Sequence, residues 1–405
     1  MSGTVIIGAG HGGTQLAASL REEGYEAPIT LLSQEPDTPY HRPPLSKSFL
    51  KSRDESLKLL RGDAFFEQNA IDLRLNCPVT AIERDAGKVE TDRGDFSYHH
   101  LVLATGTKAR RLDCPGVELR GVMHLRSAED ARQIRQYLEQ KRKIVVVGGG
   151  FIGMESAAML ATLGHSVTVL EAAPSILGRA ASAEIADHVL RACRGAGLDI
   201  RCGTKIEAIK GEHERVSAAL LGGGEELETD LVLVGIGAVP DTDLARQCGL
   251  ETDDGVVVDT HMRTDDGRIF AIGDCVRFPQ HHRAEVLRLE SVQNAADQAR
   301  ALAKTLTGRE TPFTSLPWFW SDIGPMKLQI AGLSVPDADR ISVERNGSLA
   351  SVYHLLDDEL ICVETINSGG EHMLARRMIA DGFAPDRALL EAGDLAAIKA
   401  AYQSA

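Results

Sequence analysis

The sequence contains two glycine-rich stretches, each of which directly follows a run of β-branched residues. The first is TVIIGAGHGG, which begins at Thr4, and the second is KIVVVGGGFIGME, which spans Lys143 to Glu155. A buried parallel strand that runs into G-x-G-x-x-G and then into a helix is typical of a dinucleotide-binding βαβ unit. Each such unit requires a parallel sheet with helices on both faces, so two of them predict an α/β protein.

The composition excludes several other classes of protein. A chain of 405 residues predicts roughly two to three domains. The net charge of −14 argues against a nonspecific nucleic-acid binder. Seven scattered cysteines without C-x-x-C argue against a metal site or a redox dithiol and favour a reducing compartment. We find no signal peptide and no long apolar run, so we expect a cytoplasmic protein that does not enter a membrane.

Each glycine of the first glycine-rich stretch has a different structural role. Gly8 permits the tight turn, Gly10 lets a pyrophosphate approach the backbone, and Gly13 lets the helix pack on the strand. A second strand is predicted over 29–32, and Glu35 follows it where a carboxylate can accept hydrogen bonds from a ribose. The alternative, a glycine-rich turn that binds nothing, is disfavoured by this order of elements.

The second stretch repeats the pattern with Gly148, Gly150 and Gly153, and a strand that starts at Ser166 leads to Glu171. A carboxylate at this place bonds both ribose hydroxyls of NADH and repels the 2′-phosphate of NADPH, so we expect NADH to be preferred. Arg179 lies close enough in sequence to weaken that preference. Two dinucleotide sites in one chain indicate electron transfer between two cofactors.

The segment PYHRPPLSK, which ends at Lys47, can be interpreted as a proline-stiffened loop that enters a helix. After a βαβ unit of the flavin type, however, it resembles the oxygenase-coupled NADH:ferredoxin reductases, the putidaredoxin-reductase-like FAD flavoproteins. It is also similar to the apoptosis-inducing-factor flavoproteins. The resemblance implies that Arg42 and Lys47 lie against FAD. Related peroxidases and disulfide reductases carry redox cysteines here, and this segment has none.

Four later segments continue the resemblance in the expected order. They are the Ala-Thr-Gly turn near 105, the Gly-x-Gly-x-x-Pro-Asp turn near 237, the Gly-Asp pair near 274 and the string PWFWSD near 320. The resemblance implies that Gly237 lets nicotinamide approach. It also implies that six residues in or near these segments lie close to FAD: Ala104, Thr105, Arg110, Asp274, Val292 and Trp320.

Phe151 and Glu155 lie four residues apart and therefore share one face of the predicted helix. Core packing for Phe151 and a solvated position for Glu155 are the plain alternatives. The resemblance instead implies that Phe151 lies near nicotinamide. It also implies that Glu155 pairs with Lys47 beside the flavin, and we expect these two residues to be catalytic.

These motifs predict the domain organisation. We expect two Rossmann-like dinucleotide-binding domains of the glutathione-reductase type, followed by an α+β domain. The FAD domain is discontinuous, over 1–108 and 242–322, the NADH domain covers 109–241, and the C-terminal domain covers 323–405. The last of these should hold four strands and then two helices.

The expected activity is that of an FAD-dependent NADH:ferredoxin reductase. Electrons would pass from NADH through FAD to a [2Fe–2S] ferredoxin that serves a cytochrome P450 or another oxygenase. The ferredoxin would dock on a basic patch, for which Arg309 is the candidate, and the protein could be a monomer or a homodimer. The alternatives are an NADH-sensing flavoprotein of the apoptosis-inducing-factor type and an NADH oxidase, which the missing cysteine near Pro44 disfavours.

Overall fold

The fold comes from a computed structural model that describes residues 3–52, 54–283 and 285–404. The chain forms two compact units, and it passes between them several times. Unit 1 comprises Met1–Arg42, Leu57–Lys108 and Ala238–Ser315, and unit 2 comprises Pro43–Ser56, Ala109–Gly237 and Leu316–Ala405.

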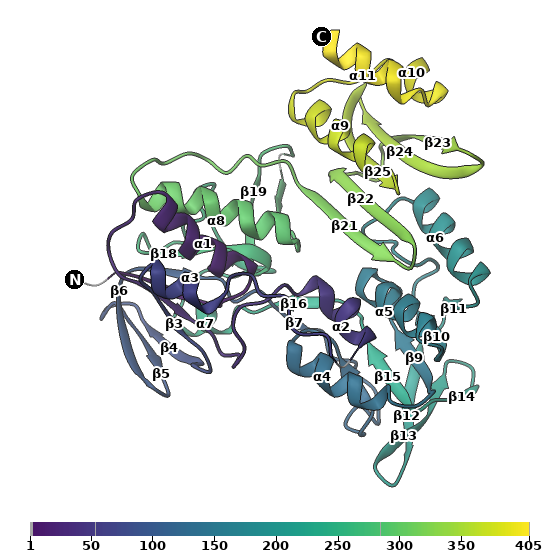
Figure 1. Cartoon of the computed structure of the whole chain (residues 1–405), viewed down its shortest axis with the longest axis horizontal. Helices are drawn as coiled ribbons and strands as arrows, with labels where there is room; N and C mark the ends of the chain where they lie inside the picture. Colours follow the sequence, from purple (N-terminus) through teal and green to yellow (C-terminus); the bar gives the residue numbers. More distant parts are fainter. Residues whose placement is uncertain (1–2, 53, 284, 405) are drawn as a thin grey trace. The chain divides into compact units, whose positions relative to one another are not determined.

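Unit 1 is built around the first glycine-bearing strand, β1 (Gly3–Ile7). This strand is fully buried and pairs in parallel with β2 (Ile29–Leu32) and β6 (Gly94–Leu103), as expected for a strand covered on both faces. The helix that follows it, α1 (His11–Glu22), lies beside α8 (Val292–Leu306) (Figure 1). The first predicted βαβ unit is therefore confirmed.

The other elements of unit 1 extend this sheet and flank it. They are α3 (Asp63–Gln68), β3 (Ile71–Arg74), β4 (Val79–Glu83), β5 (Lys88–Thr91), β7 (Thr107–Ala109), β16 (Ala238–Pro240), α7 (Asp243–Gln247), β17 (Val256–Val257), β18 (Ile269–Ala271), the 3₁₀ helix η2 (Gly273–Cys275), β19 (Val276–Gln280) and β20 (Glu285–Leu287). The main sheet has the order β3-β2-β1-β6-β5-β4, and β18 also pairs with β6. In the sheet, β1, β2, β3, β6 and β18 are parallel, and β4 and β5 form an antiparallel extension.

Unit 2 repeats this plan around the second glycine-bearing strand, β9 (Lys143–Val147). It pairs in parallel with β10 (Ser166–Glu171) and β15 (Leu231–Val234), and α5 (Phe151–Thr162) starts at its glycine-rich turn. The further elements here are α4 (Ala128–Tyr137), β8 (Val122–His124), α6 (Ala183–Gly195), β11 (Asp199–Cys202), β12 (Ile206–Glu212), β13 (Arg215–Leu221) and β14 (Glu226–Glu228). The sheet order β11-β10-β9-β15-β8 confirms the second predicted nucleotide unit.

The segment Pro43–Ser56, which includes Lys47, belongs to unit 2, whereas the sequence placed it in the FAD domain. It holds the 3₁₀ turn η1 (Pro43–Ser46) and the short helix α2 (Ser48–Lys51). Arg135 of α4 explains the difference, because its guanidinium lies 4.0 Å from the ring centre of Phe49 and bonds the carbonyl of that residue. The segment therefore belongs to unit 2 because it packs against a helix that lies much later in the sequence.

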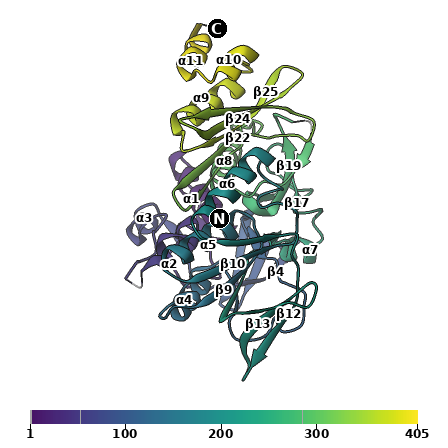
Figure 2. The same ribbon diagram turned by 90° about the vertical axis from the view of Figure 1, so that its right-hand side faces the viewer.

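The C-terminal part of unit 2 is an antiparallel sheet with three helices among the described residues (Figure 2). Its elements are β21 (Trp318–Ile323), β22 (Met326–Gly332), β23 (Asp339–Arg345), β24 (Ser348–Leu356), β25 (Glu359–Ile366), α9 (Gly369–Ala380), α10 (Arg387–Ala392) and α11 (Leu395–Ser404). The sheet order is β21-β22-β25-β24-β23. The predicted start at 323 is therefore too late, because β21 pairs with β22 along its whole length.

None of the helices among the described residues is long and apolar enough to span a membrane.

Candidate functional site

The turn after β1 in unit 1 shows why it needs glycines. Gly8 has φ +107°, and a Cβ there would lie 2.3 Å from the carbonyl oxygen of Ala104. A Cβ on Gly13 would lie 1.9 Å from the carbonyl oxygen of Gly8. Gly10, in contrast, has no atom within 4 Å of the position of a Cβ. Gly8 and Gly13 are thus required by the fold, and the space beside Gly10 suits a bound pyrophosphate.

The carboxylate of Glu35 lies in a small polar cluster of unit 1. It accepts hydrogen bonds of 2.5 Å from the hydroxyl of Tyr40 and from Nη2 of Arg42. Asp274, on η2, is also within electrostatic range of the Arg42 guanidinium. The structure therefore brings together Glu35, Arg42 and Asp274, which are predicted from separate motifs, and it adds Tyr40 of the segment PYHRPPLSK.

The other predicted flavin residues of unit 1 lie at the ends of its strands and helices. Ala104 and Thr105 follow β6, and the Thr105 hydroxyl donates to the carbonyl of Asp241 at 2.7 Å. Val292 is the first residue of α8, whose N-cap Ser291 accepts from the backbone of Asn294. Val292 thus lies at the N-terminus of α8, and the contacts of Ala104, Thr105 and Val292 with FAD stay predictions.

The turn after β9 in unit 2 repeats the geometry of the first turn. Gly148 has φ +109°, and its Cβ would lie 2.4 Å from the carbonyl oxygen of Gly235. A Cβ on Gly153 would lie 2.0 Å from the carbonyl oxygen of Gly148, while Gly150 has no atom within 4 Å of its Cβ position. Gly150 also caps α5 without a side chain, so the first turn of the helix can take an anion.

The carboxylate of Glu171 bridges two parts of this nucleotide site. Its oxygens accept from the backbone N–H of Gly149 at 2.6 Å and from that of Ala173 at 2.7 Å. An ionised carboxylate has about four lone-pair sites, so acceptors remain for the ribose hydroxyls. The backbone N–H of Arg110 donates to the carbonyl of Gly237, which has φ +104°.

Arg179 is exposed, and its guanidinium lies beside Gly237 at the end of β15. A Cβ on Gly237 would lie 3.2 Å from Nη2 of Arg179. Glu171 ends β10, and β9 separates β10 from β15 in the sheet. The arginine head group is therefore near the strand end where nicotinamide is predicted.

Lys47 and Glu155 form the predicted pair within unit 2. The lysine Nζ lies 3.1 Å from Oε1 of Glu155 and 3.0 Å from Oδ2 of Asp322. The Glu155 side chain is only 8% exposed and that of Lys47 is 18% exposed. Buried charges of this kind need both their partner and further hydrogen bonds to offset desolvation.

Two serines and a backbone amide supply those further hydrogen bonds to Glu155. Ser46 donates to Oε2 at 2.8 Å, Ser321 donates to Oε1 at 2.6 Å, and the N–H of Asp322 also donates to Oε1. We had not predicted these three contacts. The only signal in the sequence is that Ser46 precedes Lys47 in PYHRPPLSK and that Ser321 follows Trp320 in PWFWSD.

Two aromatic pairs lie on β21 and the start of α5. The Phe151 ring packs on Phe319, with ring centres 4.6 Å apart, and Trp320 lies 5.5 Å from Trp318. All four rings are half-buried. Phe151 therefore has the packing contact that the plain alternative expected, and its role near nicotinamide, like that of Trp320 near FAD, remains a prediction.

Neither a metal nor a dithiol is positioned by the described residues. They contain no group of three or more His, Cys, Asp or Glu side chains that could hold a metal ion. The cysteines there are free thiols, and burial raises the pKa of Cys193 to about 11.

Arg309, the candidate for a basic docking patch, forms an ion pair with Glu23, which offsets its charge.

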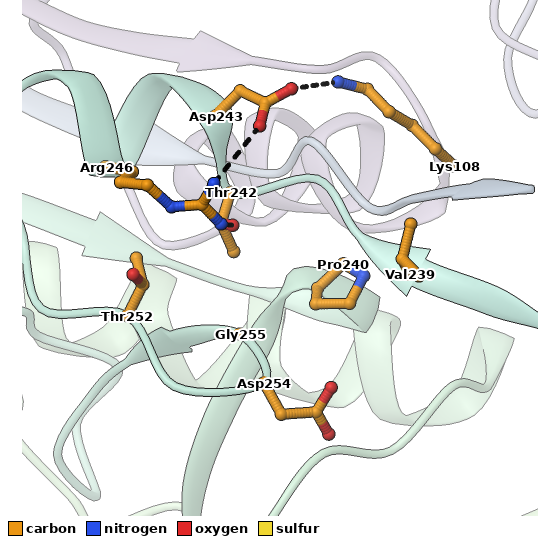
Figure 3. A pocket seen from close by; sticks show the side chains of 9 residues that line it. All are labelled: Lys108, Val239, Pro240, Thr242, Asp243, Arg246, Thr252, Asp254 and Gly255. Carbon is orange, nitrogen blue, oxygen red and sulfur yellow. Dashed lines mark hydrogen bonds and ion pairs between the residues drawn. The ribbon is translucent and has the colours of Figure 1, made fainter. Parts of the chain in front are cut away.

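A pocket of about 360 Å³ in unit 1 is lined by charged side chains (Figure 3). Lys108 bonds Asp243 at 2.6 Å and Asp241 at 2.8 Å, and Arg246 bonds the Thr242 hydroxyl. The charged residues of the lining are two cations, Lys108 and Arg246, and two acids, Asp243 and Asp254, so their charges balance. None of the predicted site residues lines it.

Comparisons with known proteins show the family of the chain. Residues 3–299 match the family model described as pyridine nucleotide-disulphide oxidoreductase, and residues 318–398 match the one described as reductase C-terminal. Rhodocoxin reductase of Rhodococcus erythropolis is 41% identical, over 93% of this chain and 89% of that protein. Rubredoxin-NAD(+) reductase of Pseudomonas putida is also 41% identical, over 90% of this chain and 95% of that protein.

The fold is similar to that of putidaredoxin reductase in its covalent complex with putidaredoxin. The TM-score is 0.94 at 35% identity, and the match covers 100% of this chain and 99% of that chain.

Proposed function

Because the chain belongs to the pyridine nucleotide-disulphide oxidoreductase family, in its branch of oxygenase-coupled reductases, we propose an FAD-dependent NADH:[2Fe–2S] ferredoxin oxidoreductase that serves an oxygenase. One observation carries the proposal: a single chain builds the same glycine-rich turn twice, once in each unit. We call these turns the first cradle (Gly8, Gly10 and Gly13) and the second cradle (Gly148, Gly150 and Gly153). Two dinucleotides then bind to one chain, as electron transfer from a nicotinamide through a flavin requires.

The residues of unit 1 fit FAD. Gly10 leaves room for a pyrophosphate at the N-terminus of α1, and Glu35 and Arg42 supply an acceptor and a cation for the rest of the nucleotide. When bound, FAD supplies the exchange between a two-electron donor and a one-electron acceptor. The protein then has to bind, orient and shield the two nucleotides.

We assign Lys47 an electrostatic role supported by its surroundings in unit 2. Two carboxylates hold its ammonium group, and two serine hydroxyls hold the carboxylate of Glu155, so the cation is fixed before any reaction begins. A fixed cation stabilises negative charge that forms on a bound cofactor, without cost for reorganisation during the step. Glu155 positions the lysine, and we propose both residues as parts of the catalytic site.

NADH is the proposed electron donor. The Glu171 carboxylate stands next to Gly149 in the second cradle, where a 2′-phosphate would meet a negative charge. Anaerobic stopped-flow reduction with NADH and NADPH tests this preference. We expect a higher ratio of rate to dissociation constant for NADH, and equal or better values with NADPH would contradict it.

The proposed acceptor is a [2Fe–2S] ferredoxin, and the similarity to the reductase solved with putidaredoxin over the whole chain supports it. One of the other named relatives is a rubredoxin-NAD(+) reductase, so the class of acceptor needs its own test. We propose a cytoplasmic enzyme, as a monomer or a homodimer.

Steady-state assays separate the proposed function from the two alternatives. With NADH and cytochrome c as terminal acceptor, we expect turnover that depends on an added [2Fe–2S] ferredoxin and exceeds that with rubredoxin. Rapid oxygen consumption without ferredoxin would indicate an NADH oxidase. A long-lived charge-transfer complex with slow turnover would indicate an NADH-sensing flavoprotein.

A further inference from the structure

The segment between β10 and α6, residues 172–182, follows Glu171 and carries Arg179. It is attached to the glycine cradle near its middle. The N–H of Leu177 donates to the carbonyl of Gly149 at 2.9 Å, and Leu177 adopts φ +56°, which leucine rarely does. Ile176 is fully buried against the same glycine. This attachment fixes the first half of the segment on the nucleotide site.

The second half of the segment ends at Ser182, and its anchor comes from the C-terminal sheet. The backbone N–H of Ser182, the N-cap of α6, donates to Oε1 of Glu364 at 2.9 Å. Glu364 lies on β25 and is only 2% exposed. All of these residues belong to unit 2.

His354 of β24 holds the other oxygen of this buried carboxylate. Its Nε2 lies 3.1 Å from Oε2 of Glu364, and its Nδ1 lies 2.7 Å from the hydroxyl of Ser334. His354 is 1% exposed and stands diagonally across the two strands from Glu364, on the same face of the sheet. The chain Ser334–His354–Glu364–Ser182 therefore orients the carboxylate toward α6.

A buried carboxylate is costly to retain unless it does something that an apolar side chain cannot. Here the Glu364 carboxylate accepts a hydrogen bond from the backbone N–H of Ser182, the last residue of the segment 172–182. The same segment carries Arg179, which lies beside Gly237. Displacing Ser182 would move a segment whose other attachment is at the glycine cradle. The placement of Arg179 beside Gly237 then depends on a residue of the C-terminal domain.

We infer that Glu364 is a positioning residue for the pyridine nucleotide, and that His354 orients it. The C-terminal domain thereby contributes to nucleotide affinity through the segment 172–182. This inference rests on the proposed function only in assigning the second cradle to NAD(H).

The first test measures binding of NADH and of ADP-ribose to the FAD-loaded protein by calorimetry. Glu364→Met keeps the length of the side chain but leaves the Ser182 N–H without an acceptor. We expect the dissociation constants of both ligands to rise about tenfold, a common size of coupling between linked sites. In turnover, the KM for NADH should rise by a similar factor while kcat changes less than about twofold.

Two further variants make this result specific. Glu364→Gln retains a carbonyl oxygen for Ser182 and should restore most of the affinity. Glu371→Met removes another buried carboxylate of the same domain, which Arg345 and Tyr353 hold, so it should lower the melting temperature without changing NADH affinity. Unchanged affinity in folded Glu364→Met, or an equal loss in Glu371→Met, would overturn the inference.

A measurement on the wild-type protein covers the case in which Glu364→Met does not fold. Because coupling is reciprocal, NADH should slow amide hydrogen exchange in peptides over 348–366 as well as over 171–185. Protection confined to the second range would overturn the inference. A wild-type protein that binds NADH but reduces no ferredoxin would refute the proposed function and leave these binding tests valid.

Discussion

The middle glycine of each cradle is the position at which the protein itself has room for a side chain. Gly10 has extended backbone angles and no neighbour within 4 Å of a Cβ, so Gly10→Ala should fold normally. The added methyl group occupies the space proposed for pyrophosphate, and we expect the dissociation constant of FAD to rise at least about tenfold, or ~1.4 kcal/mol. Fluorescence titration of the apoprotein with FAD measures it.

Two glycines provide controls for that experiment. Gly13→Ala places a Cβ 1.9 Å from a carbonyl oxygen, so it should impair folding and not only binding. Gly150→Ala should weaken NADH and leave FAD bound. If Gly10→Ala binds FAD as tightly as the wild type, the first cradle does not hold the pyrophosphate.

The pair of Lys47 and Glu155 gives the second prediction. Glu155→Gln retains the volume and removes one of the two charges that hold the lysine. We expect flavin reduction by NADH to slow about tenfold, which corresponds to ~1.4 kcal/mol of transition-state free energy. Anaerobic stopped-flow absorbance at saturating NADH measures the rate, and Glu371→Gln serves as the control for loss of a buried charge. An unchanged rate would limit the pair to a structural role.

Residues in contiguous motifs could be predicted from the sequence, and contacts between distant segments could not. The roles of Gly8, Gly10 and Gly13 follow from local backbone geometry, and the structure shows the expected steric limits. The contact between Lys47 and Glu155 was predicted only through a family resemblance. The donors Ser46 and Ser321 were missed, because nothing local to either residue indicates a carboxylate partner.

At the scale of elements, α2 depends on one arginine of α4. Nη1 of Arg135 bonds the carbonyls of Phe49, Ser52 and Glu55, and its guanidinium covers the Phe49 ring. Arg135→Met should therefore loosen the helix that begins directly after Lys47. We expect a loss of about 1–3 kcal/mol of unfolding free energy and flavin reduction that is several-fold slower.

Thermal unfolding and stopped-flow reduction check both parts of this prediction. Arg132→Met is the matched control on the same helix, because Arg132 pairs with Glu129 near the surface, where ion pairs contribute little. A normal reduction rate in a clearly destabilised Arg135→Met would show that α2 does not position Lys47.

We expect the stability of the C-terminal domain to depend on pH through His372 of helix α9. His372 is 1% exposed, and neither ring nitrogen has a hydrogen-bond partner among the described residues. Burial, with Arg376 and Lys327 nearby, lowers the pKa of His372 from 6.5 to about 4. The unfolded chain takes up this proton as pH falls through 6.5 and the folded protein does so only near 4, so stability decreases between these values.

The variant His372→Phe should remove this contribution and retain the packing against Trp318. Between pH 7 and pH 4.5, we expect the wild type to lose up to about 3 kcal/mol more unfolding free energy than the variant. Urea denaturation at several pH values measures the difference. Parallel pH profiles for the two proteins would contradict the prediction.

The sequence predicted the strands and helices well where hydrophobic pattern and glycine turns agree. The strand predicted over 29–32 has these bounds in the structure, and the strand that leads to Glu171 starts at Ser166 as predicted. The sequence predicted less well to which domain a segment belongs. Residues 43–56 and strand β21 pack on residues that are far from them in the sequence or that belong to the C-terminal sheet. A short segment between domains has no pattern of its own that tells which side it packs on.

At the scale of the whole molecule, the net charge of −14 bears on the partner. An acidic ferredoxin can dock only where basic side chains gather locally, and Arg309 is already paired with Glu23. We expect the KM for ferredoxin to rise with ionic strength between 20 and 300 mM salt, because salt screens such contacts. A KM that does not change would rule out docking through charge.

The central claim, electron transfer from NADH through FAD to a ferredoxin, is tested most directly by sequential-mixing stopped flow without oxygen. The FAD-loaded protein is first reduced with one equivalent of NADH and is then mixed with an oxidised [2Fe–2S] ferredoxin. We predict two equivalents of reduced ferredoxin, formed at least as fast as steady-state turnover, as flavin absorbance returns. Flavin that stays reduced in the presence of ferredoxin would contradict the account.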